Sequence, residues 1–425
     1  MGKWVKSLLG AIGPITKGSG ISRDQSHSGE LPAVRYGEIY THHNEYVKDY
    51  VSRISNEVAE TAQPTHRGDI LFAGSGETPD DIGKCVALLD DGVFAGGDLV
   101  IFSPPDGSDP VYWGCLLNIP YVQKQKAMRA QGSSIYHIRP DAIKKIEVVY
   151  DSDADEQRHI AEILTTCDEV IEKSEAVVEK YRAIKAGMLK DLFTRGIGKN
   201  GKLRPPPESA PQLYKDTALG KVPREWEIKT IGEMFSFKNG VSKGKEYFGH
   251  GVPIVNFTDV FNKPRITPDV LKGRVEMDRH EIDSFAVKSG DVFFTRTSET
   301  PEEIGMAAVV IGEFVDTVFS GFVLRGRPIS EDLENEFKVF CFRTDAVRKR
   351  IIGDCSYTTR ALTNGGKLSA IKMGVPSTCE QRQIAERLSA IDAKIADELA
   401  VVAKYRRVRA GLMARLLTPP DMEVE

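Results

Sequence analysis

Residues 156–187 read EQRHIAEILTTCDEVIEKSEAVVEKYRAIKAG, and residues 380–411 repeat them as EQRQIAERLSAIDAKIADELAVVAKYRRVRAG. The repeat extends over the 39 positions from 156 to 194, and 19 of these are identical to the position 224 residues later. A match of this extent at a single offset does not arise by chance. The chain therefore contains one element twice.

Each copy of this element predicts one long helix. Apolar residues recur at steps of three and four, or multiples of them, from Leu164 to Leu192 in the first copy and from Leu388 to Leu416 in the second. This spacing is typical of a coiled-coil seam, and neither copy contains Pro. Because such a helix buries one stripe, we expect the two copies to pack against each other in antiparallel orientation.

Two seam positions are polar in both copies. They are Ser174 with Glu398, and Lys185 with Arg409. Antiparallel packing about the middle of the repeat places Glu398 opposite Lys185 and Ser174 opposite Arg409, so we predict that these four residues fix the register of the helix pair. The alternative is that these side chains extend out of the seam into water.

The duplication extends beyond the helices. Gly68–Phe72 matches Gly290–Phe294, and Glu77–Gly83 matches Glu299–Gly305, both at an offset of 222 residues. The chain is therefore predicted to consist of two units, each a globular domain followed by a long helix. The expected boundaries are 1–151 for the first domain, 152–195 for the first helical spacer, 196–221 for a linker, 222–378 for the second domain, and 379–425 for the second spacer and tail.

The first domain is expected to be mixed α/β. Turn-forming Gly, Asp and Pro residues separate short apolar runs, which predicts strands at Ile70–Ala73, Cys85–Leu89, Leu99–Phe102 and Ile146–Tyr150. The expected fold class is α+β. It comprises two mixed α/β domains separated by two long antiparallel coiled-coil helices, with a pseudo-two-fold internal repeat.

Composition indicates a folded, soluble protein. The 425 residues are 41% hydrophobic and 28% charged. No apolar run approaches membrane length, and the apolar patch near the N-terminus is too interrupted for a signal peptide, so we expect a cytoplasmic location and no membrane partner. Six scattered Cys residues without a CxxC pair predict neither a disulfide framework nor a zinc site.

The charge of the chain argues against nucleic-acid binding by bulk electrostatics. The formal net charge is −4. Residues 1–150 carry 15 Lys or Arg against 18 Asp or Glu, and residues 222–378 carry 22 of each. A DNA-binding function therefore requires local clusters of basic and polar residues.

A search for catalytic motifs finds one weak candidate. Phe72–Gly76 fits the FxGxG loop of S-adenosylmethionine-dependent methyltransferases, and Ser103–Asp106 is similar to their SPP tetrapeptide. However, that tetrapeptide should end in an aromatic residue that stacks on a flipped base. The second unit also has Arg296 where the first has Gly74, a change that a cofactor loop does not tolerate. We therefore predict no catalytic and no cofactor-binding residue on this chain.

The pair His42–His43 is the other feature considered as a reactive site. It lacks carboxylate or Cys ligands at metal spacing in the sequence. We expect an exposed loop there and no metal site.

Four stretches combine turn-forming Gly with the donors that reach phosphates and base edges, namely 17–23, 238–245, 296–298 and 357–367. A solvated turn accounts for any one of them, but their clustering in domains of neutral charge favours DNA binding. The candidate contacts are Lys17, Ser19, Arg23, Arg35, Tyr36 and Ser75 in the first domain, and Lys238, Lys243, Lys245, Asn256, Thr258, Arg296, Arg360 and Lys367 in the second. Arg and Lys suit guanine, and Asn suits adenine.

The order of domain, helix, domain, helix resembles the specificity subunit of type I restriction-modification systems. The resemblance spans essentially the whole chain. Its most specific features are Glu156–Gln157 and Glu380–Gln381 at the start of the two helices, with Pro223–Glu227 and Gly251–Phe257 in the second domain.

This resemblance implies a subunit that performs no chemistry. Each domain becomes a target recognition domain that reads one half of a split double-stranded DNA target. The helices space the domains and dock two methyltransferase subunits, and restriction subunits join through the complex. S-adenosylmethionine, ATP and Mg are expected on those partners and no cofactor on this chain. A fused or stand-alone DNA methyltransferase and a coiled-coil protein-binding scaffold remain as alternatives.

Overall fold

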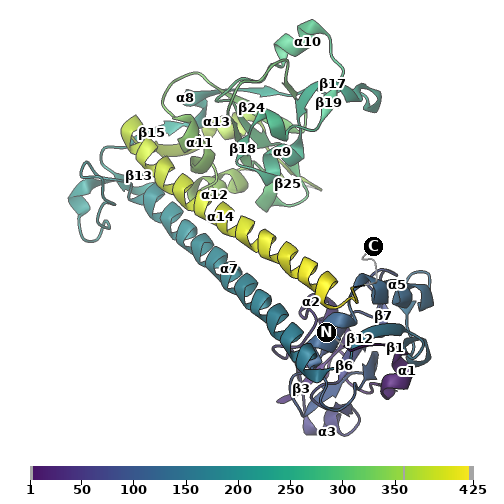
Figure 1. Ribbon diagram of the computed structural model, residues 1–425. Helices are drawn as coiled ribbons and strands as arrows, with labels where there is room; N and C mark the ends of the chain where they lie inside the picture. The colour runs from purple at the N-terminus through teal and green to yellow at the C-terminus, as the bar shows by residue number, and fades with distance from the viewer. Residues whose placement is uncertain (1–2, 358, 421–425) are drawn as a thin grey trace. The chain divides into compact units, whose positions relative to one another are not determined.

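The computed structural model describes residues 3–357 and 359–420 (Figure 1). The chain divides into two compact units. Unit 1 contains Met1–Ala176 and Glu398–Glu425, and unit 2 contains Val177–Asp397. Two long helices, α7 (Ala154–Thr194) and α14 (Thr378–Leu416), each contribute one half to each unit. Among the described residues, no helix is long and apolar enough to span a membrane. The six Cys thiols are free.

The domain of unit 1 is built on two four-stranded sheets. The first has the order β2-β10-β6-β8, and the second has the order β4-β3-β9-β5. The bounds are β1 Trp4–Leu8, β2 Ile15–Lys17, β3 Leu31–Val34, β4 Ser52–Ile54, β5 Gln63–Thr65, β6 Ile70–Ala73, β7 Ser75–Gly76, β8 Cys85–Ala87, β9 Val93–Ala95, β10 Leu99–Phe102, β11 Tyr136–His137 and β12 Glu147–Asp151. The four predicted strands are confirmed, although β8 ends at Ala87 and β12 begins one residue later than expected.

Both faces of the central strands are buried, which explains their continuous apolar sequences. Ile70 and Phe72 of β6 lie in one core cluster, whereas Leu71 and Ala73 lie in another. Successive side chains of a strand point to opposite faces of a sheet, so a strand covered on both faces needs no polar alternation. Short helices complete the domain: α1 Leu9–Ile12, α2 Tyr36–Thr41, α3 Asn56–Ala59, α4 Pro110–Leu116, α5 Pro120–Arg129 and α6 Pro140–Ile143.

The domain of unit 2 repeats this topology. Its main sheet has the order β16-β24-β20-β22-β18, which is the order of the first domain with one strand added. The bounds are β13 Tyr214–Thr217, β14 Gly220–Pro223, β15 Glu227–Thr230, β16 Phe235–Asn239, β17 Phe248–Val255, β18 Arg265–Ile266, β19 Arg274–Val275, β20 Val292–Thr295, β21 Thr297–Ser298, β22 Ala307–Val310, β23 Val318–Phe319, β24 Val323–Pro328, β25 Ser356–Tyr357, β26 Ala361–Leu362 and β27 Lys372–Val375. Its short helices are α8 Ile231–Met234, α9 Phe257–Asn262, α10 Arg279–Ser284, α11 Asn335–Cys341, α12 Asp345–Gly353 and α13 Gly365–Ala370.

Each domain core receives the start of one long helix and the end of the other. Ile160 and Leu164 of α7 lie in the unit 1 core together with Leu417, which follows α14. Ile384 and Leu388 of α14 lie in the unit 2 core together with Leu192 of α7. Full burial of one such side chain contributes about 1.5–3 kcal/mol. Within each unit the two helix segments therefore run antiparallel, as predicted.

The Gln of the repeated Glu-Gln motif ties each helix to its own domain. The Gln157 side chain donates to Asp151 O at 2.6 Å and accepts from the backbone N–H of Asp109 at 3.0 Å. Gln381 likewise donates to Pro376 O at 2.9 Å and accepts from the N–H of Glu334 at 2.9 Å. Both Gln side chains are buried, so these bonds also satisfy the polar groups of the two amides.

The polar seam positions find partners other than the predicted ones. In unit 2, Lys185 Nζ lies 2.5 Å from Asp392 Oδ1. In unit 1, Arg409 Nη2 donates to Asp168 Oδ2 at 3.0 Å and to Glu45 Oε2 at 2.7 Å. The predicted pairings of Lys185 with Glu398 and of Arg409 with Ser174 are therefore replaced by pairings with residues six positions earlier. Asp168 can neutralise Arg409, which the Ser174 hydroxyl cannot, and Asp392, the same position of the repeat, gives Lys185 a carboxylate in place of Glu398.

We predict that Arg409→Ala destabilises unit 1 by about 3–5 kcal/mol, because it leaves two mostly buried carboxylates without their cation. Urea-induced unfolding of the full chain measures the loss, and faster amide hydrogen exchange in residues 154–176 should locate it in unit 1.

The matched control for this substitution is Arg406→Ala. Arg406 pairs with Glu175 across the same two helices, but both side chains are largely exposed. The expected cost is less than about 1 kcal/mol. Equal effects of the two substitutions would contradict a special role for Arg409.

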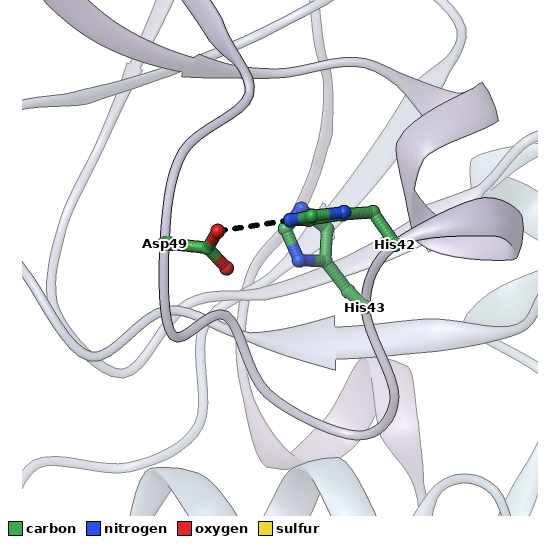
Figure 2. Close-up of side chains that lie close together, drawn as sticks. All are labelled: His42, His43 and Asp49. Atoms are coloured by element: carbon green, nitrogen blue, oxygen red, sulfur yellow. Dashed lines mark hydrogen bonds and ion pairs between the residues drawn. The ribbon is translucent and has the colours of Figure 1, made fainter. Parts of the chain in front are cut away.

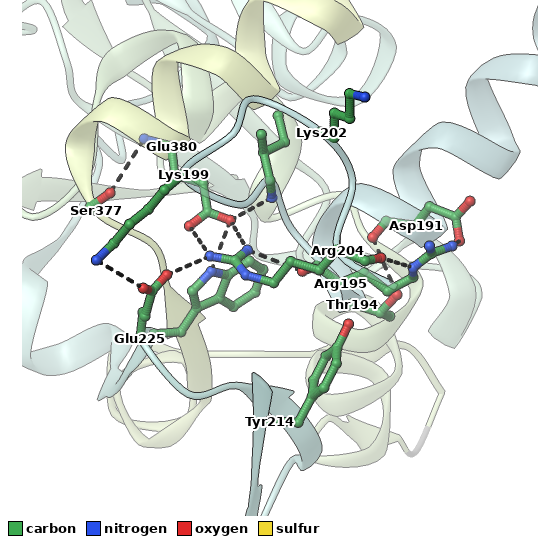
Figure 3. Close-up of polar contacts among 12 residues, drawn as sticks. Asp191, Thr194, Arg195, Lys199, Lys202, Arg204, Tyr214, Glu225, Ser377 and Glu380 are labelled. Carbon is green, nitrogen blue, oxygen red and sulfur yellow. Dashed lines mark hydrogen bonds and ion pairs between the residues drawn. The ribbon is translucent and has the colours of Figure 1, made fainter. Parts of the chain in front are cut away.

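The predicted linker is folded onto the first turn of α14. Arg204 donates to Glu380 Oε1 at 2.5 Å and to Glu225 Oε2 at 2.8 Å (Figure 3). Glu380 Oε1 also accepts from the backbone N–H of Ile197 at 2.7 Å and from the indole N–H of Trp226 at 3.1 Å. We call these residues, Ile197, Arg204, Glu225, Trp226 and Glu380, the Glu380 clamp. It fixes the predicted linker within unit 2 instead of leaving a free tether.

Glu380→Ala is expected to cost about 3–5 kcal/mol of unit 2 stability, because it leaves the buried Arg204 guanidinium without its main partner. The repeat supplies the control, since Glu156 is the equivalent residue in α7 and is exposed. Glu156→Ala should change stability by no more than about 0.5 kcal/mol. Urea unfolding and limited proteolysis at residues 196–213 provide the measurement, and an intact segment in Glu380→Ala would contradict the clamp.

Candidate nucleic-acid interface

Several loops of the first domain meet at one end of its sheets. The backbone N–H of Gly18, just after β2, donates to Leu99 O at 2.9 Å, and that of Ser19 donates to Ala95 O at 3.2 Å. A side chain at Gly18 would lie 2.0 Å from the carbonyl oxygen of Gly96, so only Gly permits this approach. We call residues 17–20, 34–36, 73–76 and 95–98 edge 1.

Edge 1 gathers most of the predicted contacts of the first domain. Lys17 and Tyr36 are exposed there, and Arg35 is half-buried at the start of α2. Arg23 is exposed in the turn that follows. The Ser19 hydroxyl donates to Thr61 O at 2.8 Å. Lys17 and Arg23 are exposed, and their cationic groups form no ion pair with another of the described residues.

Ser75 is buried, although the sequence predicted that it contacts DNA. It is 4% exposed, and its Oγ lies 2.7 Å from Nδ1 of His137. Its carbonyl accepts from the Tyr40 hydroxyl at 2.9 Å. Ser75 therefore joins β7 to β11 and α2 beneath edge 1, because two neighbouring elements use its polar groups.

The second domain forms the same edge with the same backbone bonds. The N–H of Val241 donates to Phe319 O at 2.8 Å, and that of Arg296 donates to Phe322 O at 3.1 Å. In edge 1 the equivalent bonds run from Ser19 to Ala95 and from Gly74 to Asp98, the latter at 2.9 Å. We call residues 239–242, 255–258, 295–298 and 319–322 edge 2.

The predicted residues of the second domain fall into two groups. Asn256, Thr258 and Arg296 lie on edge 2, and Arg360 is exposed in the β25–β26 hairpin, whose strand β26 pairs with β21 next to Arg296. Lys245 is exposed, and its ammonium group forms no ion pair with another of the described residues. The following cations are instead held by other groups: Lys238 by Ser284 at 2.6 Å, Lys243 by Glu281 at 2.6 Å, and Lys367 by Asp354 O at 2.8 Å and Ser356 at 2.6 Å.

The local electrostatics explain why Lys238 is held in this way. It pairs across β16 and β24 with Arg325, and Arg327 lies on the same strand. Burial, together with the charges of Arg325 and Arg327, lowers the pKa of Lys238. Asp291 neutralises Arg327 at 2.7 Å. Lys238, Arg325 and Arg327 therefore lie on the paired strands β16 and β24, and the sequence search did not single out Arg325 or Arg327.

The two edges share a backbone but differ in the side chains that they present. Arg296 stands where edge 1 has Gly74, and Phe322 stands where edge 1 has Asp98. Phe322 is 62% exposed, and Tyr357 in the adjacent hairpin is 56% exposed. Neither aromatic residue is among the predicted contacts, although Tyr357 opens the polar stretch 357–367 that the sequence singled out.

The methyltransferase-like motifs do not converge on one site. Leu99 pairs with Ala73 and Phe102 with Ile70 in the antiparallel pair of β10 and β6. The FxGxG stretch therefore ends at edge 1, whereas the SPP stretch begins with Ser103 at the opposite end of β10. The Ser103 hydroxyl donates to Asp69 Oδ1 at 2.5 Å, which gives it a structural partner.

The fold brings a carboxylate to the His42–His43 pair, contrary to the sequence expectation. Asp49 Oδ2 lies 3.0 Å from Nε2 of His42 (Figure 2). His43 is buried, not exposed, and burial lowers the pKa of its imidazole to about 4. The ring of His43 is therefore neutral at pH 7.

Comparisons with known proteins agree with this architecture. Residues 223–400 match the family model described as type I restriction modification DNA specificity domain. The chain is 24% identical over 301 residues to the type I restriction enzyme MjaVIII specificity subunit of Methanocaldococcus jannaschii, covering 69% of this chain and 67% of that protein. It is also 24% identical over 366 residues to the putative MjaX specificity subunit of the same organism, covering 83% and 78%.

The fold is shared with a solved structure over nearly the whole chain. The crystal structure of the type I restriction-modification system S subunit from M. genitalium superposes with a TM-score of 0.54 at 16% identity, covering 99% of this chain and 97% of that chain. This confirms two mixed α/β domains joined by long helices. The sequence comparisons confirm the resemblance: the chain is similar to specificity subunits of type I restriction-modification systems, and residues 223–400 match the model of their DNA specificity domain.

Proposed function

We propose that the chain is the non-catalytic DNA sequence-specificity subunit of a cytoplasmic type I restriction-modification complex. Edge 1 and edge 2 each read one half of a bipartite double-stranded target. The helices α7 and α14 hold the two domains and dock two methyltransferase subunits, and restriction subunits join through the complex. Methyl transfer and cleavage take place on those partners, which bring S-adenosylmethionine, ATP and Mg.

The observation that carries this proposal is the repetition of one backbone edge with different side chains. A shared backbone keeps the reading position constant in the two domains, whereas the change from Gly74 and Asp98 to Arg296 and Phe322 alters the donors and apolar groups presented. Arg296 can form two bonds with guanine, and an exposed aromatic ring can contact a thymine methyl group. Two unlike readers on one chain fit a target with two unlike halves.

The neutral charge of the domains is compatible with this function. Specific binding by the two domains rests on a few cations placed at the surface, such as Lys17, Arg23, Lys245 and Arg360. The methyltransferase subunits can supply the remaining phosphate contacts, which determine affinity more than sequence preference.

The test is methylome sequencing of cells that express the chain together with a candidate type I methyltransferase subunit. Methylation of adenine at one bipartite motif is expected only when both proteins are present. Calorimetric titration of the isolated chain with S-adenosylmethionine tests the methyltransferase alternative. That alternative requires a cofactor site on this chain and therefore predicts that the cofactor binds. Absence of a sequence-selective DNA shift in the presence of the methyltransferase subunits would favour the scaffold alternative.

Substitution of Arg296 or Phe322 by Ala is expected to reduce the sequence preference in the half of the target that edge 2 reads. The preference in the other half should stay unchanged. Loss of a base contact costs about 1–3 kcal/mol of discrimination at that position, or roughly tenfold to a hundredfold. Methylome sequencing of each variant measures this change directly.

Lys245→Ala is the matched control within the same domain. Its exposed ammonium group is suited to phosphate, so its removal should weaken binding equally for all DNA sequences. The slope of log K against log salt concentration should become less steep by about one. A change in the first half of the target caused by Arg296→Ala would contradict the assignment of edge 2 to one half-site.

A further inference from the structure

We propose that His42, His43 and Asp49 form a site for one divalent transition-metal ion of the zinc class. This site lies in the first domain, in the loop that follows α2, and it is independent of the proposed function. Among the described residues these three offer ligand atoms that all lie within 4.8 Å of one another. Figure 2 shows the three side chains turned toward one another.

The geometry is close to that of a tetrahedral site. Zinc binds imidazole nitrogen and carboxylate oxygen at about 2.0–2.2 Å, which places neighbouring ligand atoms roughly 3.3 Å apart. The distance between His42 Nε2 and Asp49 Oδ2 is 3.0 Å. The other ligand atoms lie within 4.8 Å of one another, and because His42 and Asp49 are exposed, rotation of their side chains can shorten these distances. The fourth position remains for water, as in other sites with three protein ligands.

The condition of His43 points to a missing partner. The residue is 4% exposed, and its Nε2 atom is buried without a hydrogen-bond partner. Leaving a buried polar atom unpaired costs about 1–3 kcal/mol, so such atoms in folded proteins usually have a bound water, ion or ligand. A metal ion held between the two imidazoles and Asp49 supplies that partner.

The surroundings provide space and favourable charge. A cavity of about 180 Å³ is lined by the three residues together with Asn44, Tyr46, Lys48, Asp168 and Glu172. Lys48 is neutralised by Glu172, and Lys84 directs its ammonium group to the backbone carbonyl of His43 at 2.7 Å. The net charge around the cavity therefore does not oppose a cation.

Metal binding would have a structural consequence for unit 1. The loop between His43 and Asp49 carries Tyr46, whose hydroxyl donates to Asp168 of α7 at 3.2 Å. A metal ion bound at both ends of this loop would restrict it and hold Tyr46 against the helix. We expect the ion to stabilise the docking of the first domain on α7.

The experiment uses the full chain, stripped of metal with a chelator and then titrated with Zn²⁺ by calorimetry. One equivalent is expected to bind, and Co²⁺ in its place should give the visible absorption of a tetrahedral site. His42→Ala and Asp49→Asn change exposed residues, so both variants should fold. Each should lower Zn²⁺ affinity by about a hundredfold or more, since loss of an outer-shell partner alone costs roughly 10–100-fold.

His250→Ala is the control. His250 forms the same kind of exposed pair with Glu276, at 2.9 Å, but lacks a second His. It should bind Zn²⁺ like the unaltered chain and show the same rise in melting temperature with the metal. The proposal is overturned if the unaltered chain takes up no Zn²⁺, or if Asp49→Asn and His42→Ala bind it as tightly as His250→Ala does.

Discussion

The pairing of a seam cation with the repeated Asp is the interaction on which the arrangement of each unit depends. An apolar seam with a heptad-like period tolerates a shift of one repeat, because Leu and Ile replace one another at similar energy. A shift separates Lys185 from Asp392 and Arg409 from Asp168, and leaves partly buried charges unpaired. The ion pairs therefore select one register among several that the seam alone permits.

The same cations connect the helix register to the domains. Arg409 also binds Glu45 of the first domain, and Lys185 lies over the ring of Phe340 in the second, 5.8 Å from its centroid. The pair in unit 1 is nearly buried, whereas the pair in unit 2 is about a quarter exposed and stabilises less. The Gln of the Glu-Gln motif adds the bonds that attach each helix start to its own domain.

The two units share one scaffold but differ in two features. Edge 1 and edge 2 keep their backbone bonds but present different side chains, so these surfaces differ without a change of fold. The Glu380 clamp is the second asymmetry. Glu380 is buried against Arg204, whereas the equivalent Glu156 is exposed. One repeated residue thus has a structural role in one unit and a solvated position in the other.

The sequence by itself determined the duplication, the two long helices, their antiparallel course and the short buried strands, because periodicity and repeated motifs are properties of neighbouring residues. It also indicated some of the turns that form the two edges, those at 17–20, 239–242 and 296–298. Only the tertiary structure decided which carboxylate meets Lys185 and Arg409, that Ser75 is buried, that Phe322 is exposed, and that Asp49 reaches His42. Each of these depends on which distant segments come together, and a local pattern that is compatible with several registers and several turns does not specify the partner.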